Sequence, residues 1–299
     1  MKQLKLFSVI FAVSLVACAS SLCIFLLIAF FQSKVRNNEG FELYQQGKLE
    51  EAIEKYNEAI EQNPKFAIAY NNLCLALASQ RKLEEAIEKC QKAIELDPKL
   101  AMAYNNLGFA LASQGKFPEA TEQYQKAIEL DPQLVEAYNN LCHALATQGK
   151  SEEAIEKCQK AIELDPKLAM AYNNIGFALA GQGKFSEAIE QCQKAIELDP
   201  KLAMAYNNLG AALAGQGKFS EAIEQYQKAI ELDPKLALAY NNLGVALASQ
   251  GRLEEAIAEY QKSLNLDPNS ALVKKNLEEA YQLLSYQLIQ RQLRQQYQY

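Results

Sequence analysis

Apolar and polar positions along most of this chain follow a pattern that returns every 34 residues. Residues 101–114 and 117–130 each place apolar side chains three or four positions apart, which predicts two amphipathic helices. Gly115 lies between them, where a helix end often needs a left-handed residue. The Asp-Pro step at 131–132 ends the second helix, because proline cannot continue a helix. Each repeat is therefore predicted to be a helical hairpin.

The fixed period predicts a stack of such hairpins, since no hairpin of this size can bury its apolar face alone. Seven of the eight prolines keep the period: Pro64, Pro98, Pro132, Pro166, Pro200, Pro234 and Pro268. Glycine recurs at the turn in six repeats, at Gly47, Gly115, Gly149, Gly183, Gly217 and Gly251, and Arg81 replaces it in the other. The seven repeats are 33–66, 67–100, 101–134, 135–168, 169–202, 203–236 and 237–270.

The second helices carry glutamate and lysine four residues apart, which predicts weak ion pairs on a solvated face. These pairs are Glu88/Lys92, Glu122/Lys126, Glu156/Lys160, Glu190/Lys194 and Glu224/Lys228. Residues 271–299 begin like an eighth first helix, but Lys274 and Glu278 replace its Tyr and Gly, so we expect a polar cap helix with a glutamine-rich tail.

Residues 6–31 contain no charge, and as a helix they reach roughly 39 Å, more than the ~30 Å of a membrane's hydrocarbon layer. This predicts an N-terminal domain, residues 1–32, that is a single-pass membrane anchor. Positively charged residues flank both ends of this segment, so they do not decide on which side of the membrane the repeats lie. The cytoplasmic side is preferred. Two alternatives remain open: a cleaved signal, and lipidation of Cys18, because residues 15–18 resemble the bacterial lipobox. The apolar helix either continues into the first hairpin or breaks near Asn37, Asn38 and Gly40.

Composition argues against several functions. The formal net charge is −6, which does not favour nucleic-acid binding. The chain has one His, no Trp and seven Cys, which leaves little material for acid–base, nucleophile or metal chemistry. We therefore expect no enzyme, no cofactor and no metal site.

One repeat carries the residues of a known family pattern: Tyr104, Leu107, Gly108, Leu111, Ala120, Tyr124, Ala127 and Pro132. This pattern resembles the tetratricopeptide repeat (TPR) over residues 33–270. The resemblance implies an all-α, right-handed superhelix, an α-solenoid, that binds proteins. It also implies that positions 2, 5, 6, 9, 12 and 13 of each repeat face the concave groove.

Positions 5 and 6 are asparagine in every repeat, although asparagine is a mediocre helix former. We expect these amides to bind the backbone of a peptide, and they resemble the asparagine ladder in the TPR domain of the O-linked N-acetylglucosamine transferase. The alternative is that they only stabilise helix packing. They are Asn37, Asn38, Asn71, Asn72, Asn105, Asn106, Asn139, Asn140, Asn173, Asn174, Asn207, Asn208, Asn241 and Asn242.

Positions 2 and 9 are mostly apolar and should give selectivity for ligand side chains. Position 2 holds Ile68, Met102, Glu136, Met170, Met204 and Leu238, and position 9 holds Phe41, Leu75, Phe109, His143, Phe177, Ala211 and Val245. The fourth repeat is polar at both, with Glu136 and His143. We hypothesise that these two form a pH-sensitive notch for a polar or basic side chain.

Cysteine replaces the glycine of position 8 twice, and each time the residue at position 24 is also cysteine. The simpler interpretation is compensation of volume across the hairpin. The alternative is two disulfides, Cys74–Cys90 and Cys142–Cys158, with Cys192 left over.

Together these features predict a membrane-tethered, non-catalytic scaffold that holds an extended or helical peptide segment of another protein. The alternative is a structural spacer, or a self-associating repeat element, with no ligand in its groove.

Overall fold

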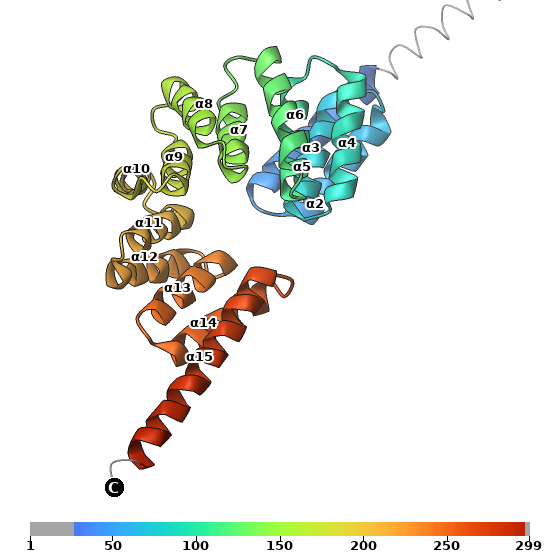
Figure 1. Cartoon of the computed structure of the whole chain (residues 1–299). Helices are drawn as coiled ribbons and strands as arrows, with labels where there is room; N and C mark the ends of the chain where they lie inside the picture. Colours follow the sequence, from blue (N-terminus) through green and yellow to red (C-terminus); the bar gives the residue numbers. More distant parts are fainter. Residues whose placement is uncertain (1–26, 297–299) are drawn as a thin grey trace, which may run out of the picture. The chain divides into compact units, whose positions relative to one another are not determined.

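A computed structural model describes residues 27–296, and these residues form fifteen helices and no strand (Figure 1). The helices are residues 27–45, α2 Leu49–Gln62, α3 Ala67–Ser79, α4 Leu83–Leu96, α5 Ala101–Ser113, α6 Phe117–Leu130, α7 Val135–Thr147, α8 Ser151–Leu164, α9 Ala169–Gly181, α10 Phe185–Leu198, α11 Ala203–Gly215, α12 Phe219–Leu232, α13 Ala237–Ser249, α14 Leu253–Leu266 and α15 Ala271–Gln296.

The chain divides into two compact parts, of which the structure describes residues 27–137 and 138–296. In each part, the two helices of a hairpin pack on each other and the second helix also packs on the first helix of the next hairpin. Examples are α3 with α4 and α4 with α5 in the N-terminal part, and α9 with α10 and α10 with α11 in the C-terminal part. The predicted all-helical stack of hairpins is confirmed within each part.

The turns follow the sequence prediction. All six glycines at the turn between first and second helices have a positive φ of 75° to 80°. Arg81 has a φ of 64°, and among the described residues it is the only one other than glycine in this conformation. Arg81 therefore occupies a backbone position that favours glycine.

The core of a hairpin depends on a small residue at position 8. The Tyr124 ring lies against the backbone of Gly108, where an added Cβ would be 2.7 Å from Tyr124 Cε1. Gly210 and Gly244 are packed in the same way against the tyrosines at position 24 of their repeats. The glycine therefore provides the space in which a buried aromatic ring packs.

Where both positions are cysteine, the structure contains disulfides. Cys74 is bonded to Cys90 and Cys142 to Cys158, with Cα–Cα distances of 5.3 and 5.4 Å. The preferred interpretation, volume compensation alone, is therefore wrong for these two hairpins, because positions 8 and 24 are close enough to be bridged. Cys192 is a free thiol, as the disulfide alternative required, and it is buried.

The predicted ion pairs on the second helices are wrong in register. Each lysine pairs with the glutamate three residues after it rather than four residues before it, at 2.7 to 2.9 Å. These pairs are Lys92–Glu95, Lys126–Glu129, Lys160–Glu163, Lys194–Glu197 and Lys228–Glu231.

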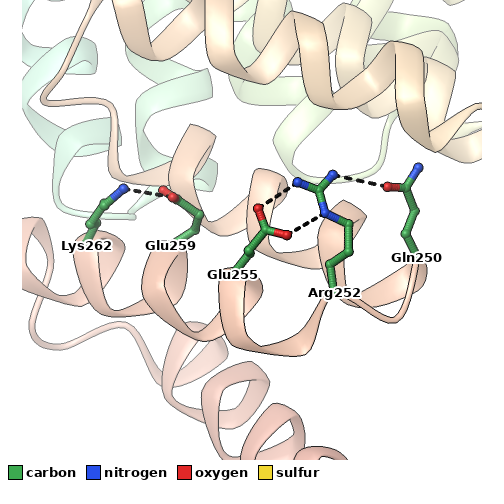
Figure 2. A network of polar contacts seen from close by, with 5 residues as sticks. All are labelled: Gln250, Arg252, Glu255, Glu259 and Lys262. Atoms are coloured by element: carbon green, nitrogen blue, oxygen red, sulfur yellow. Dashed lines mark hydrogen bonds and ion pairs between the residues drawn. The ribbon is translucent and has the colours of Figure 1, made fainter.

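Surface pairs of the same spacing lie along α14 (Figure 2). The Arg252 guanidinium donates two hydrogen bonds of 2.7 Å to Glu255 and also contacts the Gln250 side chain, while Lys262 pairs with Glu259 one turn further on. Such exposed pairs contribute little to stability, because water and salt screen the two charges. Their role is to keep this face polar.

The expected membrane anchor and membrane localisation are not supported. No helix within residues 27–296 is long and apolar enough to cross a membrane. The described end of the apolar segment belongs to a helix, residues 27–45, that runs without a break into the first hairpin and carries Lys34, Arg36 and Glu39. Residues 6–26 of the expected anchor, including Cys18, lie outside the described residues.

The helix α15 packs on α14 and partly on α13. Its Val273 and Ala280 are buried, and Leu277 and Leu284 pack beside them. Lys274 and Glu278 are exposed on the face where another hairpin would place its second helix. A side chain as large as Glu278 at position 8 leaves no room for such a helix.

Candidate functional site

The asparagines of the first helices form hydrogen-bonded ladders between repeats. In the N-terminal part, the Asn72 amide donates to Asn37 Oδ1 and the Asn106 amide donates to Asn71 Oδ1, each at 2.9 Å. Within a repeat, Asn71 donates to Asn72 and Asn105 donates to Asn106, at 3.2 and 3.3 Å. Five amides are thus joined in one chain of hydrogen bonds.

The same ladder is longer in the C-terminal part. From Asn174 onwards each position 6 amide donates to the position 5 oxygen of the preceding repeat, and from Asn173 onwards each position 5 amide donates to its own neighbour at position 6. The donors, in order from the C-terminal end, are Asn276, Asn241, Asn242, Asn207, Asn208, Asn173 and Asn174, and the last acceptor is Asn139. All distances lie between 2.9 and 3.3 Å, so the ladder is continuous.

These contacts give the asparagines the packing role that the sequence left open as an alternative. The position 5 side chains are buried, as Asn173 at 2% and Asn207 at 1% exposure show, except that of Asn139, which is half-buried. A side-chain amide has two N–H groups and two oxygen lone pairs, and the ladder uses one of each on every asparagine inside it. Binding of a ligand by the remaining groups stays a prediction.

The apolar residues at positions 2 and 9 line the same helices and are exposed. Between residues 36 and 265, every exposed large apolar side chain of the structure is at one of these two positions. They are Phe41, Ile68, Met102 and Phe109 in the N-terminal part, and Met170, Phe177, Leu238 and Val245 in the C-terminal part. We call these eight residues the apolar row.

The other residues of positions 2 and 9 differ in exposure. Leu75, Met204 and Ala211 are half-buried, while Glu136 is exposed on α7. The row is therefore uneven, with side chains of different size and depth from repeat to repeat.

His143 lies beside the apolar row on α7. Its ring is stacked on that of Phe177, with 6.3 Å between the ring centroids and 27° between the planes. Desolvation of the imidazole lowers the pKa of His143 below its usual value of 6.5. The shift favours the neutral ring, but the His143 side chain is still exposed to solvent, and the pH-sensitive notch stays a prediction.

Sequence reasoning missed two groups of residues. Asn276 on α15 donates 2.9 Å to Asn241, so the ladder extends into the cap helix. Glutamine recurs at position 14, and Gln80, Gln114 and Gln182 donate to the glutamate at position 18 of the preceding repeat. The invariance of this glutamine along the chain was the available signal.

Within residues 27–296, no three His, Cys, Asp or Glu side chains are grouped so as to hold a metal ion.

Family models match most of the chain. A model described as TPR repeat matches residues 40–80, 75–115, 110–149, 143–183, 179–217 and 213–251, and one described as tetratricopeptide repeat matches residues 237–270. No curated protein sequence gives a significant match.

Solved structures share the fold. A chain of the APC/C hetero-tetramer Cut9–Hcn1 is similar with a TM-score of 0.71 at 20% identity over 81% of this chain, which spans about half (48%) of that chain. A tetratricopeptide repeat protein from Parabacteroides merdae gives 0.69 at 18% identity, over 84% of this chain and 99% of its own. A thermophilic TPR protein from Thermus thermophilus gives 0.57 at 21% identity, over 60% and 98%.

Proposed function

The chain belongs to the tetratricopeptide repeat family, and we propose that it is a non-catalytic scaffold whose first helices bind an extended or helical segment of another protein. TPR proteins generally act in protein interaction. We place the seven repeats at residues 33–270 and the cap helix with its tail at 271–299. Within each part, the ligand would lie across the residues of the apolar row and the asparagine ladder of that part.

The apolar row is the observation that carries this proposal. Large apolar side chains on a folded protein are normally buried, and exposed rows of them mark interaction surfaces. Between residues 36 and 266 the second helices expose one large apolar side chain, Leu266 at the end of α14, whereas the first helices expose eight. Met102 and Met170 have flexible, polarizable side chains that adapt to ligands of different shape.

The asparagines would contribute less to ligand binding than their number suggests. Their amides are held in place by the ladder, so a ligand would meet a pre-organised polar floor rather than mobile side chains. Each remaining N–H or lone pair could bond to the backbone of a peptide, which is independent of the ligand's sequence. Selectivity would then come from the apolar row, and from Glu136 and His143.

Capture of the partner tests the proposal. Full-length protein would be used to purify partners from a lysate of its own host, and compared with the variant Met170→Ala/Phe177→Ala. The matched control is Glu190→Gln/Lys194→Gln on α10, which changes two exposed side chains of a second helix. A protein that binds wild type and control but not the first variant supports the proposal. Equal recovery with all three contradicts it.

A second measurement locates the ligand directly. A photo-crosslinking amino acid in place of Phe177 should form a covalent adduct with the captured protein, whereas the same group in place of Lys194 should not. Adducts formed equally at both positions would show that the contact is not specific to the apolar row.

The alternative function, a structural spacer, is favoured by the ladder itself. The asparagine amides bind each other and so explain their own presence without a ligand. A spacer should behave identically when the apolar row is changed.

A further inference from the structure

The cap helix exposes an apolar stripe of its own. Leu283, Tyr286, Ile289 and Leu293 are 54%, 62%, 52% and 39% exposed. Their spacing of three or four residues places them within about 120° of arc on one face of α15. This stripe is separate from the apolar row, which ends with α13.

Nothing in the C-terminal part covers this stripe. Val273 and Ala280, which are buried, lie on the opposite face of α15, and Leu284 is the last residue packed against the core. Residues 285–295 are exposed or half-exposed, and the end of the helix projects beyond α13 and α14 (Figure 1). A few turns of isolated helix are only marginally stable in water, so a packing partner would stabilise this segment.

We propose that α15 pairs in antiparallel orientation with α15 of a second copy of this chain. The stripe is self-complementary in this orientation, because Leu283 lies opposite the partner's Leu293 and Tyr286 lies opposite the partner's Ile289. A two-fold axis between the helices repeats both contacts, so all four side chains of each copy are covered.

The charges on α15 favour the antiparallel orientation over the parallel one. Arg291 and Arg294 are the only charged residues after Glu279. A parallel pair would place each arginine beside the same arginine of the other chain, and the two positive charges would repel each other. The antiparallel pair places the arginines of the two copies at opposite ends of the interface. The projecting position of the stripe also keeps the two repeat arrays apart.

The interface is small. Four side chains from each copy bury less than the ~1,200 Å² that stable complexes usually require. The dimer should therefore form at micromolar concentrations and be in exchange with the monomer.

Analytical ultracentrifugation of the full-length chain tests the dimer. Wild type should sediment as a mixture whose mean mass rises with concentration from 33.4 kDa towards twice that value. The variant Leu283→Gln/Ile289→Gln/Leu293→Gln keeps a good helix former at each position and should raise the dimer Kd at least tenfold. Arg291→Gln, which lies on another face, is the matched control. A wild type that stays monomeric at about 100 µM, or a variant that dimerises equally well, overturns the proposal.

Crosslinking tests the orientation and does not depend on the stability of the triple variant. A mixture of Leu283→Cys and Leu293→Cys chains should oxidise mainly to the mixed dimer, identified by peptide mass. Each variant crosslinking mainly to itself would indicate a parallel pair and would overturn the antiparallel model. Loss of binding to a groove ligand would leave both results unchanged, so this proposal and the proposed function fail independently.

Discussion

The Asn208 side-chain amide donates a hydrogen bond of 2.9 Å to Oδ1 of Asn173, which lies 35 residues earlier in the chain and one repeat away. Asn173 is 2% exposed, so its amide has little access to water that could replace this contact. The bond joins consecutive first helices through their polar side chains, beside the apolar contacts of the core. Removal of one amide therefore leaves its neighbours with unsatisfied buried groups.

We expect Asn173→Ala to lower the free energy of unfolding by about 1–3 kcal/mol, because Asn208 loses its acceptor and Asn174 loses its donor. Urea unfolding followed by circular dichroism measures the change. Asn38→Ala is the control, since Asn38 is an exposed asparagine at position 6 of the first repeat, and it should stay within about 0.5 kcal/mol of wild type. Equal effects of the two substitutions would argue against a stabilising ladder.

Gly244→Ala should destabilise the C-terminal part by about 1–3 kcal/mol, because the new Cβ would be 2.6 Å from Tyr260 Cε1. Gly181→Ala is the matched control. Its Cβ would have only Ser151 Oγ nearby, at 3.8 Å, so the better helix propensity of alanine should leave stability unchanged or raise it by up to about 1 kcal/mol. Thermal unfolding of both variants compares the two sites. A stable Gly244→Ala protein would show that the tyrosine ring can move aside.

The cysteines of residues 27–296 should react differently with a thiol reagent. Non-reducing peptide mapping should find Cys74 linked to Cys90 and Cys142 linked to Cys158. Burial raises the pKa of Cys192 to about 12, so almost no thiolate is present at pH 8. Cys192 should therefore be labelled by iodoacetamide only after denaturation. Alkylation of Cys74 or Cys142 in denatured, unreduced protein would contradict the disulfides.

The stability of the protein should depend on pH through His143. Its pKa is lowered in the folded state, so the unfolded chain takes up a proton more readily as the pH falls through about 6.5. This group therefore stabilises the fold fully above that pH, and the contribution is lost as the pH falls towards the folded-state pKa.

The variant His143→Phe isolates this effect, because phenylalanine occupies position 9 in three other repeats. Acidification from pH 7.5 to 5 should lower the unfolding midpoint of wild type more than that of the variant. The carboxylates titrate in both proteins and cancel in the comparison. Parallel pH profiles would contradict the desolvation of His143.

The hairpins and their turns could be predicted because they depend on local sequence. Apolar spacing, the Asp-Pro steps and the recurring glycine act within a few residues. Arg81 is an exception to the glycine pattern, yet the structure gives it the same positive φ. The family resemblance and the solved structures agree with that result.

Contacts between side chains were harder to predict. The asparagine files are visible in the sequence, but the rotation of one first helix against the next decides which amide meets Asn173. The choice of ion-pair partner for Lys194 depends on its rotamer, because Glu190 lies four residues before it and Glu197 three residues after it on the same helix. The structure pairs it with Glu197. The disulfides depend on the separation of positions 8 and 24 in three dimensions, which period and composition do not specify.

The asparagine ladder also has an evolutionary consequence. Every repeat within it both accepts from the following repeat and donates to the preceding one, so a duplicated segment of 34 residues carries with it the groups that join it to its neighbours on either side. Tandem duplication or deletion of a repeat would conserve the hydrogen bonds at the new junction. The number of repeats is therefore free to change within a lineage, and selection can lengthen or shorten the array without first redesigning its interfaces.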